Sequence, residues 1–325
     1  MEAIGGYFSL ELPRHEEYHR NATSLNTGRN CLEYILRVRK YSKVYIPYYT
    51  CEVVLEPFTK LNIAYDFYHI NFDFELTNEI VLGDNEALLY TNYYGLKQSY
   101  IEQLANKYGL QLIIDNTQAF FTKPIPGIDT FYTCRKFFGV PDGAYLYIDL
   151  LLDMEMEQDS SFERMHFLTK RIDLSPEAGY RDYQALSRTL VGQPIKRMSK
   201  LTQRMMQGIE YESIIQKRKT NYHMLDVALG NDNCIKLPIE YDAVPMVYPY
   251  LSLVKGLREK LIDNKVFVPC YWPNVMEWCQ SNSREYKLAE NLVCLPIDQR
   301  YGESHMMHIV SCISKIMKEL NENSI

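Results

Sequence analysis

The sequence predicts an α/β protein whose large domain is a three-layer, mainly parallel sheet and whose smaller C-terminal domain is α+β. The first observation is that short β-rich runs alternate with amphipathic helical runs from residue 28 to about residue 150, which is typical of parallel strands joined by crossover helices. The second is the length of 325 residues, which suits one large domain followed by a smaller one. We therefore expect the large domain to span residues 1–230 and the small domain to span 231–325.

The elements of the large domain are expected to follow one another with short connections. Leu32, Ile35 and Leu36 fall on one face of the first expected helix. Pro57 is expected to interrupt the second helix, and Gly109 to end the third. The expected helices are 31–41, 52–61 and 99–109, and the expected strands are 43–49, 63–70, 86–95, 110–115, 127–134 and 143–150. In the small domain, the β-rich runs 244–254 and 265–272 precede a final helix over 309–320.

Composition and charge exclude several classes of protein. The chain has 35 Lys+Arg against 41 Asp+Glu, a formal net charge of −6, so it lacks the basic balance of a nucleic-acid-binding protein. No run approaches the roughly 18 apolar residues of a membrane-spanning helix, and the N-terminus lacks the pattern of a signal peptide. The eight cysteines are scattered, which is typical of reduced thiols in the cytoplasm. His305 and His308 have the spacing of a metal-ligand pair, but no third ligand is evident and we predict no metal site.

Asp115 is the first candidate for chemistry. It ends an apolar strand, and ligands in parallel sheets bind at the carboxyl ends of the strands. A carboxylate at that edge either meets a cationic ligand or caps the following turn, and the cap is the commoner fate. Gln118 follows three residues later and could face the same crevice.

Lys136 is the second candidate. It follows Arg135 and precedes two phenylalanines, in a loop between two expected strands. Apolar neighbours and an adjacent like charge both lower the pKa of a lysine amine, and a neutral amine can attack a carbonyl carbon. The alternative is a surface lysine whose apolar stem packs on the protein while its amine stays in water.

The third candidate is the start of the first helix, at residues 27–30. Backbone N–H groups at a helix N-terminus bind phosphate, and Gly28 would allow the phosphate to approach closely. The three candidates together meet the needs of pyridoxal phosphate (PLP), whose phosphate needs an anchor, whose ring nitrogen needs an anion and whose aldehyde needs an amine.

Seven segments carry a resemblance to a known family. Four of them, LNTGRNCLEYIL, IIDNTQAF, DTFYTCRKFFGVPDGAYLYID and LVCLPID, resemble in this order the phosphate-binding helix start, the acidic strand, the lysine segment and the late Leu-Pro signature of the DegT-like sugar aminotransferases. KVYIPYYTCEVV and EALLYTNYYG resemble two of the family's strands, and PIKRMSKLTQRMM, near the end of the large domain, resembles its dimer-contacting helix region. These enzymes belong to the fold-type I PLP-dependent enzymes, and the resemblance extends over nearly the whole chain.

The resemblance implies a role for each matched residue. Lys136 would form a Schiff base with the cofactor and then move the proton, Asp115 would face the ring nitrogen, and Gln118 would orient the ring. The residues expected to seat the phosphate are Gly28, Arg29, Asn30 and Thr133. Cys51 falls where the family commonly has an aromatic side chain over the ring, with Tyr48 and Tyr49 just before it, and which of these side chains covers the ring stays open.

The activity implied is transfer of an amino group from an amino acid such as glutamate to a keto group of a nucleotide-activated sugar. The implied setting is cell-surface polysaccharide biosynthesis, in a cytoplasmic homodimer. Dehydrating relatives carry histidine in place of the lysine, so Lys136 speaks against that reaction. A member that binds cofactor or sugar nucleotide without transamination remains an alternative, because the segment expected to cover the ring is unusual.

Overall fold

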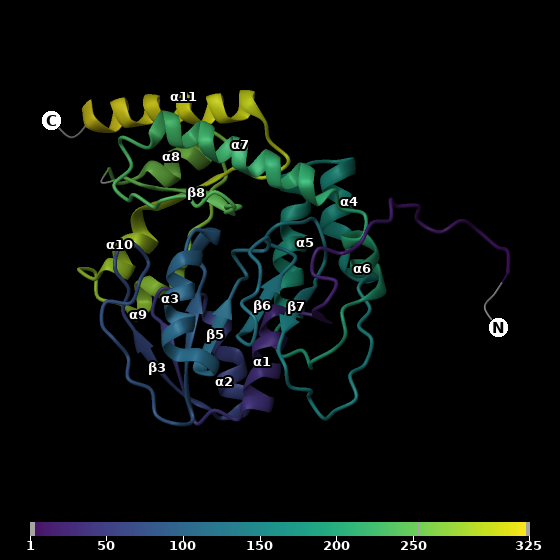
Figure 1. Cartoon of the computed structure of the whole chain (residues 1–325). Coiled ribbons are helices and arrows are strands. Elements are labelled where there is room, and N and C mark those ends of the chain that lie inside the picture. Colours follow the sequence, from purple (N-terminus) through teal and green to yellow (C-terminus); the bar gives the residue numbers. More distant parts are fainter. Residues whose placement is uncertain (1–3, 253, 323–325) are drawn as a thin grey trace.

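The computed structural model describes residues 4–252 and 254–322, the last two of these without their side chains. Its main feature is a seven-stranded sheet in the order β1-β7-β6-β5-β4-β2-β3 (Figure 1). Neighbouring strands from β3 to β6 run parallel, whereas β7 is antiparallel to β6 and β1 is antiparallel to β7. The strands are β1 (Thr23–Leu25), β2 (Lys43–Pro47), β3 (Ala64–Tyr68), β4 (Glu86–Thr91), β5 (Leu112–Asp115), β6 (Asp129–Thr133) and β7 (Ala144–Tyr147). The mainly parallel sheet predicted from the sequence is confirmed.

Two apolar clusters cover the two faces of this sheet, and the alternation of side chains along β5 separates them. Ile113 belongs to the cluster formed with α1 and α2, whereas Leu112 and Ile114 belong to the cluster formed with α3. All three side chains are almost completely buried. Because successive side chains of a strand point to opposite faces, a strand buried on both faces reads as a continuous apolar run.

The helices of the large unit lie on both sides of the sheet. They are α1 (Gly28–Arg39), α2 (Leu55–Leu61), α3 (Gln98–Tyr108), α4 (His166–Asp173), α5 (Pro176–Thr189), α6 (Lys200–Met206) and α7 (Tyr211–Leu229). The prediction that Pro57 interrupts a helix is wrong, because Pro57 lies in the first turn of α2, where a backbone N–H has no partner within the helix. The residues before α2, Glu52–Val54, form a short 3-10 helix.

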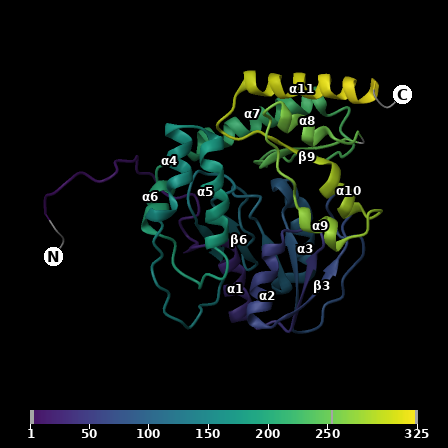
Figure 2. The same cartoon turned by 180° about the vertical axis from the view of Figure 1, so that it is seen from behind.

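A second, two-stranded sheet packs with helices at one end of the molecule (Figures 1 and 2). Its strands β8 (Val247–Leu251) and β9 (Leu292–Pro296) are antiparallel. The helices of this part are α8 (Leu257–Asp263), α9 (Pro273–Trp278), α10 (Arg284–Asn291) and α11 (Glu303–Glu322). The β-rich run 265–272 forms no strand, and β8 pairs instead with β9, which contains most of the late Leu-Pro signature. Helix α7 packs against β8 and α11, and the division of the chain at residue 230 stays a prediction.

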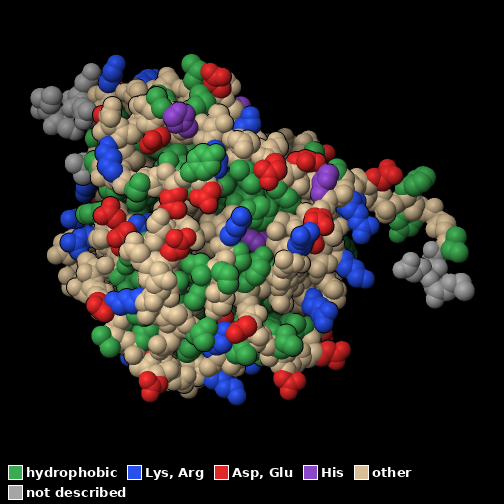
Figure 3. All heavy atoms as spheres, in the orientation of Figure 1, with side chains coloured by type: hydrophobic (Ala, Val, Ile, Leu, Met, Phe, Trp, Pro, Cys, Tyr) green, Lys and Arg blue, Asp and Glu red, His purple; other side chains and the backbone are tan. Residues whose placement is uncertain are grey.

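The N-terminal segment extends away from the body of the molecule (Figure 1). The side chains of Tyr7 and Phe8 are 98% and 94% exposed, and apolar side chains of the arm project into solvent in the space-filling view (Figure 3). Leu12 and Pro13, farther along, accept hydrogen bonds from Arg204 and so join the segment to α6. Within the described ranges no helix is long and apolar enough to cross a bilayer.

Candidate functional site

A cavity of about 450 Å³ opens at the carboxyl ends of β5 and β6, beside the first turn of α1. Six of the residues predicted to form the site line it together: Gly28, Arg29, Cys51, Asp115, Thr133 and Lys136. Asn30 and Gln118 are not among its lining residues. The cavity therefore has the position that the sheet topology predicts for a ligand site.

Lys136 and Asp115 meet at one end of this cavity, with Thr117 between them. The Nζ atom of Lys136 donates a hydrogen bond to Thr117 Oγ1 over 2.8 Å. The Oδ1 atom of Asp115 accepts a hydrogen bond from the Thr117 backbone N–H, also over 2.8 Å. One threonine thus fixes both the carboxylate and the amine. The sequence analysis missed Thr117, although its place two residues after a strand-end Asp is the usual signal for such a turn.

The environment shifts the pKa values of both groups toward their neutral forms. Burial lowers the pKa of the Lys136 amine, and the nearby charge of Asp115 partly offsets this. Burial also raises the pKa of the Asp115 carboxyl, against the charge of Lys136 and the hydrogen bonds from Thr117. The Lys136 side chain as a whole keeps surface exposed, because it borders the open cavity. A desolvated amine that a reagent can reach is what nucleophilic attack requires.

The first turn of α1 forms the neighbouring part of the cavity wall. Thr27 caps the helix, its Oγ1 accepting from the Asn30 backbone N–H at 3.2 Å and lying 2.6 Å from Asn30 Oδ1. The Asn30 side chain donates to the carbonyl of Gln193 at 2.9 Å and so lies in the wall behind the helix. Among the residues that the structure describes, none accepts a hydrogen bond from the backbone N–H groups of Gly28 or Arg29. Two backbone donors at a helix N-terminus are therefore available to an anion.

Gly28 is needed for close packing at this point. A Cβ atom there would lie 3.4 Å from Thr117 Cγ2 and 3.9 Å from the ring of Phe131. The helix start therefore lies directly against the turn that holds Lys136 and Asp115. The Arg29 guanidinium turns to α2 and forms an ion pair of 2.6 Å with Glu56.

Arg135 also lines the cavity; its place beside Lys136 just beyond a strand makes it a candidate by position, but no role was predicted for it. Its Nε and Nη2 atoms are buried and have no hydrogen-bond partner in the described part of the chain. The guanidinium carbon lies 5.4 Å from the centre of the Tyr183 ring of α5. Desolvation lowers the pKa of this guanidinium, and the charges of Tyr183 and Asp142 partly offset this effect.

The predicted contributions of Gln118 and Cys51 have different outcomes. Gln118 is fully buried, and its Oε1 accepts a hydrogen bond from the Tyr94 backbone N–H at 3.0 Å. Its oxygen is thus engaged outside the cavity lining, whereas its Nε2 is buried without a partner among the described residues, and its role in orienting a ring stays a prediction. Cys51 does line the cavity, and burial raises the pKa of its thiol.

Aromatic side chains line the cavity, but Tyr48 and Tyr49 are not among them. Tyr48 stacks on Phe67 at a centroid distance of 4.6 Å, and Tyr49 packs against Trp272 at 5.3 Å. The aromatic lining residues are Phe131, Tyr183, Tyr271 and Trp272. Two of them come from a loop more than a hundred residues beyond Lys136, and no sequence signal joined them to the site.

A second hollow of about 440 Å³ adjoins the first and shares Arg135, Lys136 and Tyr183 with it. Its other polar lining includes Arg171 and the ion pair between Arg300 and Asp298, which measures 2.6 Å. The side chain of Lys136 therefore borders both hollows.

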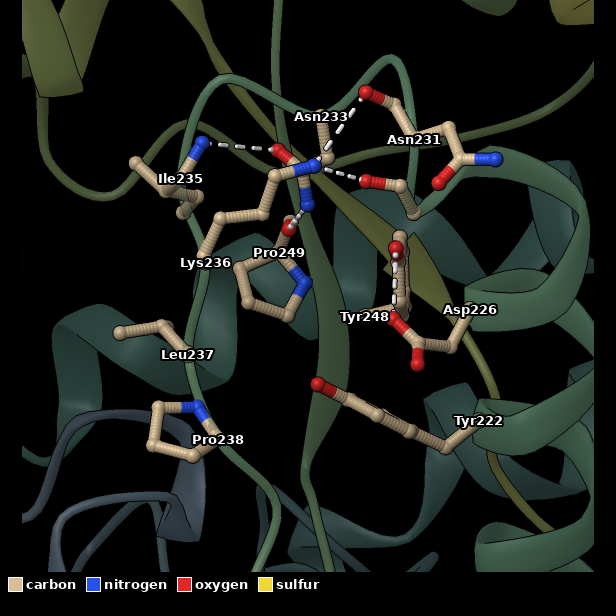
Figure 4. A pocket seen from close by; sticks show the side chains of 11 residues that line it. Tyr222, Asp226, Asn231, Asn233, Ile235, Lys236, Leu237, Pro238, Tyr248 and Pro249 are labelled. Atoms are coloured by element: carbon tan, nitrogen blue, oxygen red, sulfur yellow. Dashed lines mark hydrogen bonds between the residues drawn. The ribbon is translucent and has the colours of Figure 1, made fainter.

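A pocket of slightly larger volume, about 480 Å³, lies elsewhere, between α7 and β8 (Figure 4). Lys236 reaches back to the backbone carbonyls of Gly230 and Asn231, and Tyr248 donates to Asp226 at 3.2 Å. None of the predicted site residues lies here.

No family model and no curated protein sequence matches the chain significantly. Solved structures do match it. Spr1654 from Streptococcus pneumoniae in its apo form, assigned as a sugar aminotransferase, gives a TM-score of 0.69 at 14% identity over 98% of this chain and 94% of that one. DesV from S. venezuelae, in complex with a ketimine intermediate, gives 0.65 at 15% identity over 90% and 84%. CalS13, a sugar aminotransferase from Micromonospora echinospora, gives 0.62 at 12% identity over 91% and 87%.

These matches confirm the predicted fold class. The chain, with its seven-stranded, mainly parallel sheet, therefore shares the fold of these aminotransferase structures. At 12–15% identity the likeness establishes the fold, and the activity must be argued from the site.

Proposed function

We propose that the chain is a DegT-like, PLP-dependent aminotransferase that transfers an amino group from an amino acid, such as glutamate, to a keto group of a nucleotide-activated sugar. The observation that carries the proposal is the arrangement of Lys136, Thr117 and Asp115 in one cavity with the open first turn of α1. The fold supports it, because Spr1654 has also been solved in PLP and PMP forms with TM-scores of 0.67 and 0.67.

The lining residues fit the chemical groups of PLP. The free N–H groups of Gly28 and Arg29 suit its phosphate, together with the hydroxyl of Thr133. Asp115 would hold the ring nitrogen, and the Lys136 amine would hold the aldehyde carbon. The aromatic lining residues offer flat apolar surface for the ring. When bound, PLP supplies an electrophilic carbon and a ring that withdraws electrons from the reacting amino group.

The residues of the chain prepare this chemistry before any ligand arrives. The lowered pKa of Lys136 increases the fraction of neutral amine, which can attack a carbon or accept a proton at Nζ. Thr117 Oγ1 fixes the position of that Nζ atom. Asp115 has a hydrogen bond from Thr117 but forms no ion pair within the described residues. A cationic ring nitrogen would therefore stabilise its ionised form.

The second hollow supports a reaction with two substrates. It borders the Lys136 side chain from the side of α4 and α5, so it offers room for a substrate beside the cavity proposed for the cofactor. Its arginines suit an anionic substrate, such as an amino acid carboxylate or a sugar diphosphate. The homodimer, the cytoplasmic location and the role in cell-surface polysaccharide biosynthesis follow from the proposed family and are part of the same proposal.

A second candidate function is cofactor binding without transamination. Two observations favour it: Gln118 is engaged with the Tyr94 backbone, and the thiol of Cys51 stands where an aromatic ring is common in the family. This candidate predicts a protein that binds PLP and accepts no amino group from any donor.

One spectroscopic experiment separates these functions. Purified protein mixed with PLP is expected to become yellow, and adding glutamate is expected to remove the visible band as the cofactor takes up the amino group. A visible band that persists with every amino acid would favour the binding-only function. No band, together with no retention of PLP on gel filtration, would contradict both.

A further inference from the structure

Among the described residues, Arg135 is the one lining cation of the central cavity whose side chain forms neither an ion pair nor a hydrogen bond. The charged lining residues are Arg29, Asp115, Arg135 and Lys136. Arg29 pairs with Glu56 at 2.6 Å, and the charge of Lys136 is balanced by the nearby carboxylate of Asp115. Arg135 forms no ion pair within the described ranges. The cavity therefore carries one uncompensated positive charge.

The carboxylates that could neutralise Arg135 are engaged elsewhere. Asp142 is the carboxylate whose charge raises the pKa of Arg135. It already forms an ion pair of 2.9 Å with Arg164 and accepts a hydrogen bond from Thr202. Tyr183 covers one side of the Arg135 guanidinium through its ring, which offers no hydrogen-bond acceptor there. Two buried guanidinium nitrogens consequently remain without partners in the described part of the chain, an arrangement that costs free energy unless a ligand completes it.

The position of Arg135 indicates what this ligand is. Arg135 lines the central cavity together with Gly28, Arg29 and Thr133. The guanidinium therefore shares this cavity with the two free backbone N–H groups of the first turn of α1 and with the hydroxyl of Thr133. Backbone donors, a hydroxyl and a planar guanidinium together form a site for a phosphate group.

We infer that Arg135 is the cationic ligand of the phosphate group of the cofactor, an inference that rests on the proposed function. The guanidinium would donate hydrogen bonds to the phosphate oxygens, together with the backbone N–H groups of the first turn of α1. Arg135 and Lys136 are neighbours in the chain, so one loop binds the phosphate with one residue and the aldehyde with the next. The competing possibility is that Arg135 binds a carboxylate or phosphate of a substrate in the second hollow, which it also lines.

The test compares PLP with pyridoxal, which has the same ring and aldehyde but no phosphate. For Arg135→Gln we expect the Kd of PLP to rise roughly 10- to 100-fold, the effect of losing hydrogen bonds to a charged group. The Kd of pyridoxal should stay within about twofold of the wild-type value, because the substitution changes nothing that pyridoxal contacts. Arg135→Lys should give an intermediate loss, since lysine keeps the charge but not the planar donors. Arg188→Gln, an exposed arginine of α5, is the control and should bind both compounds normally.

A second readout uses inorganic phosphate and protein without cofactor. Phosphate should raise the Tm of the wild type and of R188Q, but not that of R135Q. Without any ligand, R135Q should be at least as stable as the wild type, because it removes a buried charge that has no partner. A lower Tm of ligand-free R135Q would identify Arg135 as a structural residue and overturn the inference.

The remaining outcomes separate this inference from the proposed function. Equal losses of PLP and pyridoxal affinity in R135Q, or no loss of either, would overturn the phosphate role while leaving the proposed function intact. A wild type that binds neither compound would contradict the proposed function. In that case, a Tm rise with phosphate that occurs in the wild type and not in R135Q would still support an anion site at Arg135. A wild type whose Tm does not rise with phosphate would overturn that site as well.

Discussion

The central cavity and the pocket in Figure 4 are similar in volume and opposite in chemistry. In the pocket between α7 and β8, Asn233 accepts hydrogen bonds from the backbone of Ile235 and Leu251, at 3.2 and 2.9 Å, and donates to the carbonyl of Pro249 at 2.9 Å. No buried side-chain nitrogen or oxygen in its lining lacks a partner among the described residues. This lining completes its own hydrogen bonding and needs no ligand to do so.

The central cavity leaves several polar groups incomplete. Within the described ranges the helix-start N–H groups are free, Arg135 has two buried nitrogens without partners, and the pKa values of Asp115 and Lys136 are shifted in opposite directions toward neutrality. Groups of this kind are destabilising in the empty protein and are satisfied by a bound ligand. Polar groups that lack hydrogen-bond or ionic partners, and not the size of the cavity, therefore distinguish the candidate site from the other pocket.

The largest effect is expected from Lys136→Ala. Without the amine, PLP should no longer give a visible band, and the rate of amino transfer should fall by about 100- to 10,000-fold, the usual contribution of a positioned acid–base group. Absorbance spectroscopy and a coupled transamination assay measure the two effects. A K136A protein that still forms the band through another amine would show that Lys136 is not the residue that binds the aldehyde.

A smaller loss is expected from Asp115→Asn. This variant keeps an oxygen that can accept from the Thr117 N–H and removes only the charge. Because the charge is what stabilises a protonated ring nitrogen, we expect kcat to fall roughly 100-fold, the size of effect seen when one electrostatic contact to a reacting centre is removed. PLP should still be retained. An unchanged kcat would mean that the Asp115 carboxylate only caps its turn. Asp115 would then resemble Asn233 of the Figure 4 pocket, whose hydrogen bonds join segments of the backbone.

The same variant predicts a direction of pH dependence. Attachment of PLP requires neutral Lys136, so its rate should rise with pH through a midpoint below the ordinary lysine pKa. The Asp115 charge raises the pKa of Lys136 against the effect of burial, so D115N should move the midpoint to still lower pH. The pH profile of the rate at which the visible band forms provides the measurement. A midpoint that moves upward in D115N would contradict the coupling of these two residues.

Thr117→Val should have a more modest effect. Valine has nearly the same shape but cannot accept the hydrogen bond from Lys136 Nζ. Loss of one such bond is worth about 1 kcal/mol, so the rate of PLP attachment should fall roughly fivefold. Thr117→Ser keeps the hydroxyl and should restore most of the rate. Equal rates in the valine and serine variants would show that the hydroxyl does not position the amine.

The sequence was sufficient for the parts of this site that depend on local pattern. Asp115 was found because it ends an apolar strand, and Lys136 because an amine beside apolar residues has a lowered pKa; the structure places both in one cavity. Spacing alone left the direction of the Gln118 side chain open: its Oε1 accepts a hydrogen bond from the Tyr94 backbone N–H, and its role toward a ring stays a prediction.

The lack of partners around Arg135 could not be predicted in this way. It depends on where Glu56, Asp142 and Arg164 find their own partners, and those residues are far apart in the chain. The contributions of Tyr271 and Trp272 depend in the same way on how the C-terminal part packs against the sheet. Contacts between residues far apart in the chain are not encoded in a short sequence motif, so they could not be predicted from local pattern.

The smallest effect is expected from Lys236→Ala in the Figure 4 pocket. Lys236 is exposed, and its amine donates only to the backbone carbonyls of Gly230 and Asn231 among the described residues, which water can reach once the side chain is removed. We expect a change in the free energy of unfolding within about 0.5 kcal/mol and a change in Tm of no more than about 2 °C. PLP binding, measured by absorbance titration, should equal that of the wild type. K236A is therefore the matched control for K136A. If K236A impaired PLP binding, a pocket whose buried polar groups all have hydrogen-bond partners could no longer be taken as one without function.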